Sequence, residues 1–315
     1  MKKILLVKTS SLGDVIHNLP VATDIRRQLP EARIDWLVEE PYAALVALHP
    51  AVHRVIPVAI RRWRRGLLGH RTWKEIAEFR RLSQAEAYDA VVDTQGLVKS
   101  AVLARAARGR RHGFDAASAR EPLAARLYDV THHVARAQHA VRRNRLLAAA
   151  ALGYRVGDGI DYGIAAPAAA AREPYCVLLH GSSRGDKLWP EASWIELGRR
   201  LEARGMRCLL PWGSDDERLR SGRIAAGLER ADVPAAMPLD RLAGALRGAR
   251  AVAGVDTGLT HLAAALSRPV AAIYCATDPR LTGVVGGPAT RNVGGPGHVP
   301  SAEEVWEALA DVGAV

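Results

Sequence analysis

The chain has 315 residues, of which 49% are hydrophobic and 24% charged, and its formal net charge is +11 with a pI near 10.0. This balance excludes an intrinsically disordered chain, and the length is sufficient for two domains that each bury a core. The longest apolar runs are alanine-rich and stop well short of the roughly 20 residues that cross a bilayer, so we predict no transmembrane helix.

The N-terminus and the cysteines predict an intracellular protein. Met1 is followed by two lysines and a short apolar strand rather than by the core of a signal peptide, so we expect a cytoplasmic location. Cys176, Cys208 and Cys275 lack the spacing of a metal site, and the first two lie inside apolar strands. We therefore expect reduced thiols in the core.

The excess of basic residues indicates an anionic partner, which can be nucleic acid, anionic lipid or a phosphorylated substrate. A genome that favours arginine and alanine everywhere would explain the excess about equally well. The position of the basic residues along the chain is therefore more informative than their number.

Short apolar runs alternate with amphipathic stretches along most of the chain, which is typical of βα units around a parallel sheet covered on both faces. A segment rich in glycine, alanine and proline interrupts the pattern after Gly153, and it indicates a linker. We predict an α/β protein with two Rossmann-like, doubly wound domains facing a central cleft. The expected parts are residues 1–155, a linker over 156–173, residues 174–300, and a C-terminal helix over 301–315 that begins with a Ser301–Glu304 capping box.

The predicted elements follow this rhythm in chain order. Strands are expected at 3–7, 33–38, 52–59, 88–95, 175–183, 206–214, 249–257 and 269–275, and helices at 15–28, 42–48, 72–86, 97–107, 191–204, 215–227 and 258–266.

Asp14 lies in the first loop between a strand and a helix, after Thr9, Ser10, Ser11 and Gly13. Open parallel sheets bind ligands at the carboxyl ends of their strands, and a carboxylate there can act as a general base. The alternative is that Asp14 is only the N-cap of a helix that begins at Val15. His17 can assist Asp14 or face solvent, and we favour the solvent-facing interpretation.

Two loops in the second half suit a phosphate. The segment HGSSRGDKLWP (180–190) offers the hydroxyls of Ser182 and Ser183 and the charge of Lys187 to a phosphate. The alternative is a solvated turn with a surface lysine. The segment lacks the spacing of a Walker loop. In VAGVDTGLTHLAAAL (252–266), Thr257 and Gly258 open a helix whose first N–H groups can bind an anion, with Asp256 and His261 beside them. An ordinary Asp-Thr helix cap is the alternative.

The segment PWGSDDE (211–217) also follows a predicted strand. Glu217 is the candidate that accepts hydrogen bonds from the ribose hydroxyls of a nucleotide. Asp215 and Asp216 are better explained as charges at a helix start. Met237 can line an adenine pocket, although a core position explains a methionine slightly better.

Basic residues of the first half form a second group. RRWRR places Arg61, Arg62, Arg64 and Arg65 around Trp63, which suits anionic groups and a membrane interface. No nucleic-acid recognition motif accompanies them, so we predict no nucleic-acid partner. No carboxylate or cysteine completes a ligand set around the histidines, so we predict no metal site. Further anion-binding candidates are Lys99, Arg120, His132, His133, Arg136 and His139.

Taken together, these segments resemble the lipopolysaccharide heptosyltransferase I family. The segments are KTSSLGDVIHNLP, PVAIRRWRR, YDAVVDTQGLVKSA, AREPLA, HAVRRNR, DKLWPEASW, LPWGS and VDTGLTHLAAAL. The resemblance implies a GT-B glycosyltransferase that transfers heptose from ADP-L-glycero-D-manno-heptose to Kdo of Kdo-lipid A, inverting the anomeric carbon without a metal or other cofactor. It also implies a peripheral enzyme on the cytoplasmic face of the inner membrane, bound to an anionic surface.

Carried onto this chain, the resemblance assigns a role to each candidate. Asp14 is the expected catalytic base, and Lys187 supports the leaving group. Ser182 and Ser183 stand where the family usually has threonine, and the segment 274–279 departs from the family at Cys275-Ala276, so we assign it no role. The donor residues are Ser182, Ser183, Lys187, Glu217, Met237, Asp256, Thr257, Gly258 and His261, and the acceptor residues are Ser10, Ser11, Arg61, Arg62, Arg64, Arg65, Lys99, Arg120 and His139.

Two alternatives stay open at this point. A related transferase would add a second heptose or another nucleotide-activated sugar. A non-catalytic module would only bind an anion or a nucleotide.

Overall fold

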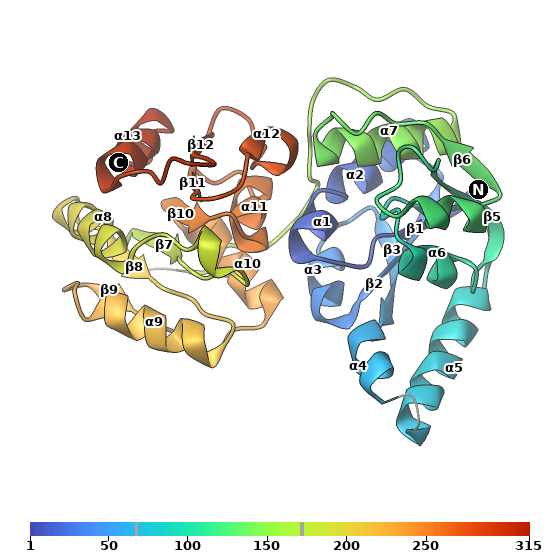
Figure 1. The fold of residues 1–315 in the computed structure, drawn as a ribbon, viewed down its shortest axis with the longest axis horizontal. Helices are drawn as coiled ribbons and strands as arrows, with labels where there is room; N and C mark the ends of the chain where they lie inside the picture. The colour runs from blue at the N-terminus through green and yellow to red at the C-terminus, as the bar shows by residue number, and fades with distance from the viewer. Residues whose placement is uncertain (67–68, 171–172) are drawn as a thin grey trace. The chain divides into compact units, whose positions relative to one another are not determined.

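The chain folds into two units, Met1–Ile164 and Ala165–Val315 (Figure 1). The computed structural model describes residues 1–66, 69–170 and 173–315. The boundary falls inside the predicted linker 156–173, of which residues 171–172 lie outside the described residues. Tyr162 is only 6% exposed and the carbonyl oxygen of Gly157 accepts a hydrogen bond from Arg145, so the first part of that segment packs on the N-terminal unit.

The N-terminal unit contains a six-stranded sheet with the order β3-β2-β1-β4-β5-β6, and every neighbouring pair is parallel. Its elements are β1 (Lys3–Val7), α1 (Leu12–Ile16), α2 (Leu19–Gln28), β2 (Arg33–Glu39), η1 (Glu40–Tyr42), α3 (Ala43–Val46), β3 (Val52–Val58), α4 (Ile60–Arg65), α5 (His70–Gln84), β4 (Ala87–Asp93), α6 (Val98–Ala104), β5 (Arg108–Phe114), η2 (Pro122–Leu127), β6 (Val130–His132) and α7 (Ala140–Leu152).

The C-terminal unit contains a second six-stranded parallel sheet, with the order β12-β11-β10-β7-β8-β9. Its elements are β7 (Tyr175–Leu179), η3 (Gly185–Lys187), α8 (Glu191–Ala203), β8 (Arg207–Leu209), α9 (Asp215–Ala225), β9 (Ala231–Asp232), α10 (Leu239–Gly248), β10 (Ala251–Val255), α11 (Gly258–Ala265), β11 (Val270–Tyr274), α12 (Pro279–Thr282), β12 (Thr290–Gly294) and α13 (Ala302–Asp311).

Both sheets have the same topology. In each, the first strand in the chain pairs with the second on one side and with the fourth on the other, so the strand order reverses at that pair. A crevice opens at the carboxyl ends of the strands at such a switch point, and ligands of doubly wound folds bind there. The predicted doubly wound class is confirmed for both units, and the switch points lie at β1/β4 and at β7/β10.

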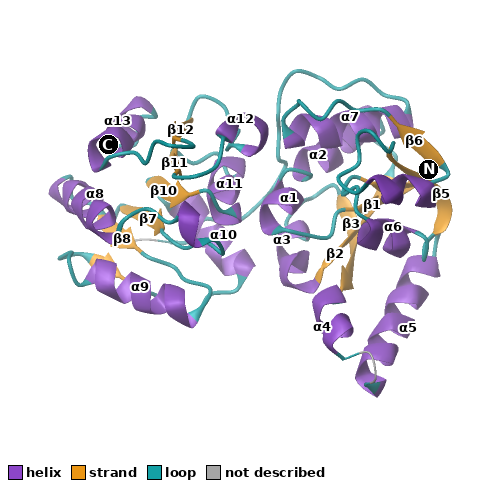
Figure 2. Ribbon diagram, in the orientation of Figure 1, coloured by secondary structure: helices purple, strands orange, loops and turns teal. Residues whose placement is uncertain are grey.

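Helices cover both faces of each sheet (Figure 2). Alternate residues of a strand point to opposite faces, and accordingly Leu5 and Val7 of β1 join one core cluster while Ile4 and Leu6 are buried outside it. That cluster includes Trp63 of α4, Phe79 of α5, and Leu103 and Ala104 of α6, so these three helices cover the same face. On the other face, α7 packs against α2, β4 and β5.

The predicted helix over 15–28 is two helices in the structure, α1 and α2. Pro20 lies in the first turn of α2, where its missing N–H is tolerated because the first amides of a helix have no intrahelical partner. The same residue inside a continuous helix would clash with the carbonyl of residue 16. The chain therefore restarts its helix after Asn18.

Several elements were not predicted. The strand β5 (RGRRHGF) is too rich in charge to show a strand pattern, and β6, β9 and β12 have five residues or fewer. Helix α7 lies in an alanine-rich segment for which we predicted no element. These segments are ordered by neighbouring strands and by the sheet face they cover, and neither is visible in a local window.

The C-terminal helix is α13, and its predicted capping box is confirmed by hydrogen bonds between Ser301 and Glu304. All three cysteines are buried free thiols, as predicted. Within the described residues, no helix combines the length and the apolar character that a bilayer crossing needs.

Candidate functional site

Asp14 lies in the first turn of α1 at the carboxyl end of β1. Its Oδ2 atom accepts hydrogen bonds from the Ser11 amide at 2.9 Å and from the Ser11 hydroxyl at 3.2 Å. The residue that caps α1 is Ser11, so the alternative in which Asp14 caps a helix beginning at Val15 is wrong. The helix begins three residues earlier because Leu12 and Gly13 already have helical geometry, which leaves the Asp14 carboxylate beside the loop.

The loop before α1 is held by Gln95, which follows β4 across the switch point. Oε1 of Gln95 accepts hydrogen bonds from the amides of Thr9, at 2.9 Å, and Ser10, at 3.3 Å. Nε2 of the same side chain donates to the Ser10 carbonyl oxygen. Gln95 is 6% exposed, so these bonds form in a buried setting where they fix the path of the backbone toward Asp14.

A buried cation lies under the same loop. Nζ of Lys8, the residue that follows β1, donates to the Thr94 carbonyl oxygen at 2.8 Å and lies 3.4 Å from Oδ1 of Asn144. Burial lowers the pKa of Lys8, while the carboxylates of Asp14 and Asp93 oppose that shift.

One acceptor candidate, Lys99, lies next to this loop and bonds another, Ser10. Nζ of Lys99, in the first turn of α6, donates to the Ser10 hydroxyl at 3.0 Å. Ser10 is 7% exposed, whereas Ser11 is exposed. Burial raises the pKa of Glu39 at the end of β2, against the effect of Lys99 and Arg61 nearby. The structure thus brings Ser10, Ser11, Asp14 and Lys99 together, and Glu39 adds a second carboxyl group.

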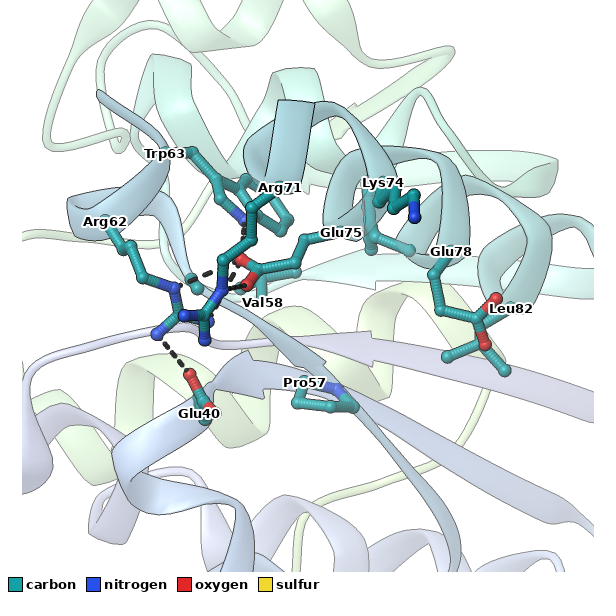
Figure 3. A pocket seen from close by; sticks show the side chains of 12 residues that line it. Glu40, Pro57, Val58, Arg62, Trp63, Arg71, Lys74, Glu75, Glu78 and Leu82 are labelled. Atoms are coloured by element: carbon teal, nitrogen blue, oxygen red, sulfur yellow. Dashed lines mark hydrogen bonds and ion pairs between the residues drawn. The ribbon is translucent and has the colours of Figure 1, made fainter. Parts of the chain in front are cut away.

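The four arginines of α4 are exposed, but they are not equivalent. Arg62 is bound by two acids, Glu40 at 2.7 Å and Glu75 at 3.0 Å (Figure 3). Trp63 is 8% exposed, packs in the core and donates its indole N–H to Glu75. Our expectation that this tryptophan suits a membrane interface is therefore wrong, because its side of α4 faces the sheet.

The histidines are less available than expected. His17 is 4% exposed, so the solvent-facing interpretation is wrong, and its ring contacts the ring of His139 at 5.5 Å between centroids. His139 caps α7, accepting a hydrogen bond from the Val141 amide. His132 bonds His112, and His133 bonds Asp115, so both have protein partners rather than an open anion site.

In the C-terminal unit, Lys187 and Asp256 form an ion pair across the switch point, with Nζ and Oδ2 separated by 2.6 Å. The Lys187 side chain is 18% exposed, so the interpretation as a solvated surface lysine is wrong. The Thr277 hydroxyl donates to the same oxygen at 2.7 Å, and Nε2 of His261 lies 3.8 Å from the other. Burial alone would raise the pKa of Asp256, but hydrogen bonds from His261, Lys187 and Thr277 hold that pKa well below its usual value.

Helix α11 begins at this cluster. Thr257 is its N-cap residue and Gly258 its first residue, and both are partly exposed. The Thr257 side chain forms no capping hydrogen bond, so the alternative of an ordinary side-chain cap does not describe it. The N-terminus of α11 therefore lies beside a lysine, an arrangement that suits a diphosphate.

A pocket of about 700 Å³ adjoins the ends of β7 and β8, and it is lined by both predicted serines and by Glu217. Oε2 of Glu217 accepts from the Gly213 amide at 2.7 Å. A Cβ atom at position 181 would lie 2.4 Å from Oε1 of Glu217, so a glycine there permits the carboxylate to approach the strand end. Met237, just before α10, is half-buried and not part of the core, so the core interpretation is wrong.

Sequence reasoning missed Lys8, Glu39, Gln95 and Thr277. Lys8 directly follows β1 and Glu39 ends β2, while Gln95 and Thr277 lie two and three residues after β4 and β11. The carboxyl ends of the predicted strands could therefore have indicated them. Thr277 lies in the segment 274–279, to which we had assigned no role, and it bonds Asp256. Across the described ranges, no group of three or more His, Cys, Asp or Glu is arranged to hold a metal ion.

The model of glycosyltransferase family 9 (heptosyltransferase) matches residues 76–305. The chain is 48% identical over 290 residues to lipopolysaccharide heptosyltransferase 1 of Salmonella typhimurium, covering 90% of this chain and 92% of that protein.

Two solved structures of the Escherichia coli heptosyltransferase WaaC are similar over almost the whole chain. The structure with ADP has a TM-score of 0.93 and 44% identity, and the structure with ADP-2-deoxy-2-fluoro heptose has a TM-score of 0.88 and 43% identity. Each match covers 98% of this chain and 99% of the other.

Proposed function

The chain belongs to glycosyltransferase family 9, the heptosyltransferases, and we propose that it transfers L-glycero-D-manno-heptose from ADP-heptose to Kdo of Kdo-lipid A. The observation that carries this proposal is the 48% identity over 90% of the chain to a lipopolysaccharide heptosyltransferase 1. The chain is a glycosyltransferase of lipopolysaccharide inner-core biosynthesis. Because the chain belongs to a family of glycosyltransferases, nothing supports the alternative in which it is a non-catalytic module that only binds an anion or a nucleotide.

The donor site is proposed in the C-terminal unit. Its support is the likeness to structures that hold ADP or a fluorinated ADP-heptose, together with the cluster at the β7/β10 switch point. Lys187 and the start of α11 at Thr257 and Gly258 hold the diphosphate. The remaining donor contacts are Ser182 and Ser183 at the phosphates, Glu217 and Met237 at the adenosine, and Asp256 and His261 near the heptose.

The proposed reaction is a single displacement with inversion at C1 of the heptose. Asp14 accepts the proton of a Kdo hydroxyl while the oxygen of that hydroxyl forms a bond to C1. The bond from C1 to the diphosphate oxygen breaks, and ADP leaves with the electron pair. Lys187 and the amides at the start of α11 stabilise the charge that develops on the diphosphate.

This division of roles requires no metal ion, since a lysine and a helix N-terminus supply the positive potential. Turnover should therefore be unchanged after treatment with EDTA and should not rise on addition of Mg²⁺. Loss of turnover on chelation, restored by a divalent cation, would contradict the assignment.

The acceptor side is proposed in the N-terminal unit, around Ser10, Ser11, Lys99, Arg120 and the arginines of α4, with His139 beside His17. Kdo-lipid A is anchored in the inner membrane, so the enzyme is proposed to act at the cytoplasmic face as a peripheral protein. The support is the family of the chain and the four exposed arginines of α4.

Asp14→Asn tests the role of the base. General-base catalysis typically contributes about 10²–10⁴-fold, so kcat should fall by that order while ADP affinity is retained. The assay is ADP release with ADP-heptose in the presence of deacylated Kdo-lipid A, and calorimetry measures ADP binding. Turnover close to that of the parent enzyme would eliminate Asp14 as the base.

Glu39→Gln is the matched control, because Glu39 is the other carboxyl group near the loop and burial raises its pKa. It should retain far more turnover than Asp14→Asn, and the reverse order would move the role of the base to Glu39.

The same assay discriminates between acceptors. Turnover only with an acceptor that already carries one heptose would assign the chain to the second transfer.

A further inference from the structure

Lys8 is a buried basic residue that the proposed reaction does not use. It directly follows β1 and is only 5% exposed. Arg145, which is 2% exposed in the same unit, pairs directly with Asp24. Among the described residues Lys8 forms no such ion pair, and the acceptors of its hydrogen bonds are neutral. Because burying an ammonium group without a paired carboxylate is costly, its presence here indicates a role beyond packing.

The hydrogen bonds of Lys8 join three elements of the N-terminal unit. Its Nζ atom donates to the carbonyl oxygen of Thr94, just after β4, at 2.8 Å, and lies 3.4 Å from Oδ1 of Asn144 in α7. The Thr94 hydroxyl in turn donates to Oδ1 of Asn18, the N-cap residue of α2, at 2.8 Å. The ammonium group thus lies at the centre of a buried polar network at the carboxyl end of β1.

Asn144 connects this network to the helix that carries the proposed base. Its Nδ2 atom donates to the carbonyl oxygen of His17 at 3.2 Å, and His17 is the C-cap residue of α1. Helix α1 has only five residues, and Asp14 is the third of them. A movement of the C-terminal end of so short a helix therefore also moves the Asp14 carboxylate.

The charge of Lys8 also acts on Asp14. The charged groups that face the ammonium group are Asp14 of α1, Asp93 of β4, Arg143 of α7 and Arg120, and Tyr42 of η1 faces Asp14 itself. Asp93 accepts hydrogen bonds from the Tyr128 hydroxyl and the Gln95 amide, each at 2.8 Å, so it has donors other than Lys8. Because water screens a buried charge poorly, the ammonium group of Lys8 favours the ionised form of Asp14.

We propose that Lys8 is a positioning residue for the proposed base: its buried ammonium group ties α1 to β4 and α7 and keeps the Asp14 carboxylate ionised. The proposal rests on the proposed function, because it requires that Asp14 removes the proton of the acceptor. A purely structural role would affect stability and position but would leave the charge of Asp14 unchanged. The two roles are therefore separated by the pH dependence of turnover.

The test is ADP release with ADP-heptose and deacylated Kdo-lipid A between pH 5 and pH 8, in proteins that circular dichroism shows to be folded. Lys8→Met should lower kcat about 10–100-fold and shift the acidic limb of its pH profile upward by about 1 pH unit. Lys2→Met, an exposed lysine just before β1, should give the parental profile. An unshifted limb in folded Lys8→Met would overturn the proposal, whereas an inactive parent would overturn the proposed function instead.

A second variant removes the link to α1 and keeps the charge. Asn144→Leu should also lower kcat about 10–100-fold, but its acidic limb should stay at the parental pH because Lys8 remains. An equal upward shift in Asn144→Leu and Lys8→Met would overturn the role of the charge.

The parent enzyme provides a test that does not depend on the folding of Lys8→Met. Salt screens exposed charges and leaves buried ones nearly unaffected, so the acidic limb should be the same at about 0.05 and 0.5 M NaCl. A limb that moves upward with salt would show that exposed cations keep Asp14 ionised, and it would overturn the proposal.

Discussion

At the scale of single residues, the loop that presents Asp14 depends on the amide of one side chain. Gln95 satisfies two amides and one carbonyl oxygen of residues 9 and 10, and it belongs to the neighbouring strand end rather than to the loop. A displacement of about 1 Å at a reacting group can reduce a rate by roughly 10²-fold. Gln95 is therefore a positioning residue for the proposed base.

Gln95→Met keeps the length of the side chain and removes all three hydrogen bonds. We expect kcat to fall about 10–100-fold, with the KM for ADP-heptose nearly unchanged because the proposed donor contacts lie in the other unit. Gln84→Met is the matched control, since Gln84 is exposed at the end of α5. A folded Gln95→Met enzyme with parental kcat would show that the loop holds its position without these three hydrogen bonds.

Lys187 is the second residue whose effect can be predicted. A hydrogen bond to a charged group contributes about 1.5–3 kcal/mol, so Lys187→Met should weaken ADP binding by roughly 10–150-fold. Because Asp256 would lose its cation, the double variant Lys187→Met, Asp256→Asn separates the loss of binding from the loss of stability. Calorimetric titration with ADP measures the effect, and Lys99→Met, a lysine of the N-terminal unit, is the control that should bind ADP normally. Parental affinity in both Lys187 variants would remove the lysine from the diphosphate site.

At the scale of elements, helices α2 and α7 are joined by a buried ion pair. The Arg145 guanidinium contacts Asp24 at 2.7 and 3.0 Å, and the side chains are only 3% and 10% exposed. Arg27 on the same helix α2 pairs with Asp161, but these side chains are 59% and 46% exposed. The two pairs differ mainly in burial, so they allow a direct comparison.

Arg145→Leu should destabilise the N-terminal unit by about 3–5 kcal/mol, because it leaves the buried Asp24 carboxylate without a partner. Arg27→Leu should cost at most about 1 kcal/mol, as exposed pairs usually do. Replacing Asp24 and Arg145 together by leucine should recover most of the loss, since two apolar side chains leave no unpaired charge. Urea unfolding measures all three, and equal effects of the two single variants would show that burial is not decisive.

At the scale of the whole molecule, each unit holds a buried neutral histidine. Burial lowers the pKa of His49 in the N-terminal unit and of His180 in the C-terminal unit to about 4. Oγ1 of Thr23 lies 3.0 Å from Nε2 of His49, and Oγ of Ser221 lies 2.7 Å from Nε2 of His180. Between pH 6.5 and 4 the unfolded chain binds a proton that the folded chain does not, so stability falls as pH falls through this window.

Each histidine should therefore reduce the free energy of unfolding of its unit by about 2 kcal/mol between pH 7 and pH 5. His49→Gln and His180→Gln should each remove that part of the pH dependence in one unit only. Urea unfolding at the two pH values, followed by the tryptophans of each unit, measures the change. An unaltered difference between pH 7 and pH 5 in either variant would show that the histidine is not the titrating group.

The sequence by itself determined the class of fold and most of the donor candidates. Hydrophobic periodicity located the strands β1, β2, β3 and β11 and the helices α8 and α11 to within one residue at each end. It could do so because buried parallel strands are continuous apolar runs and their covering helices are amphipathic. It also placed Asp14, Lys187, Asp256, Thr257 and Glu217 after strands, where the ligand crevices of such sheets open.

Tertiary structure alone decided which of these groups meet. The pairing of Lys187 with Asp256 joins residues 69 positions apart, and Gln95 reaches the Ser10 amide across 85 positions. The burial of His17 and Trp63 and the exposure of Trp73 likewise depend on which side of the adjoining helix faces the sheet. A local pattern reports the polarity of a side chain, whereas its partners and its solvent contact are fixed only when distant strands come together at a switch point.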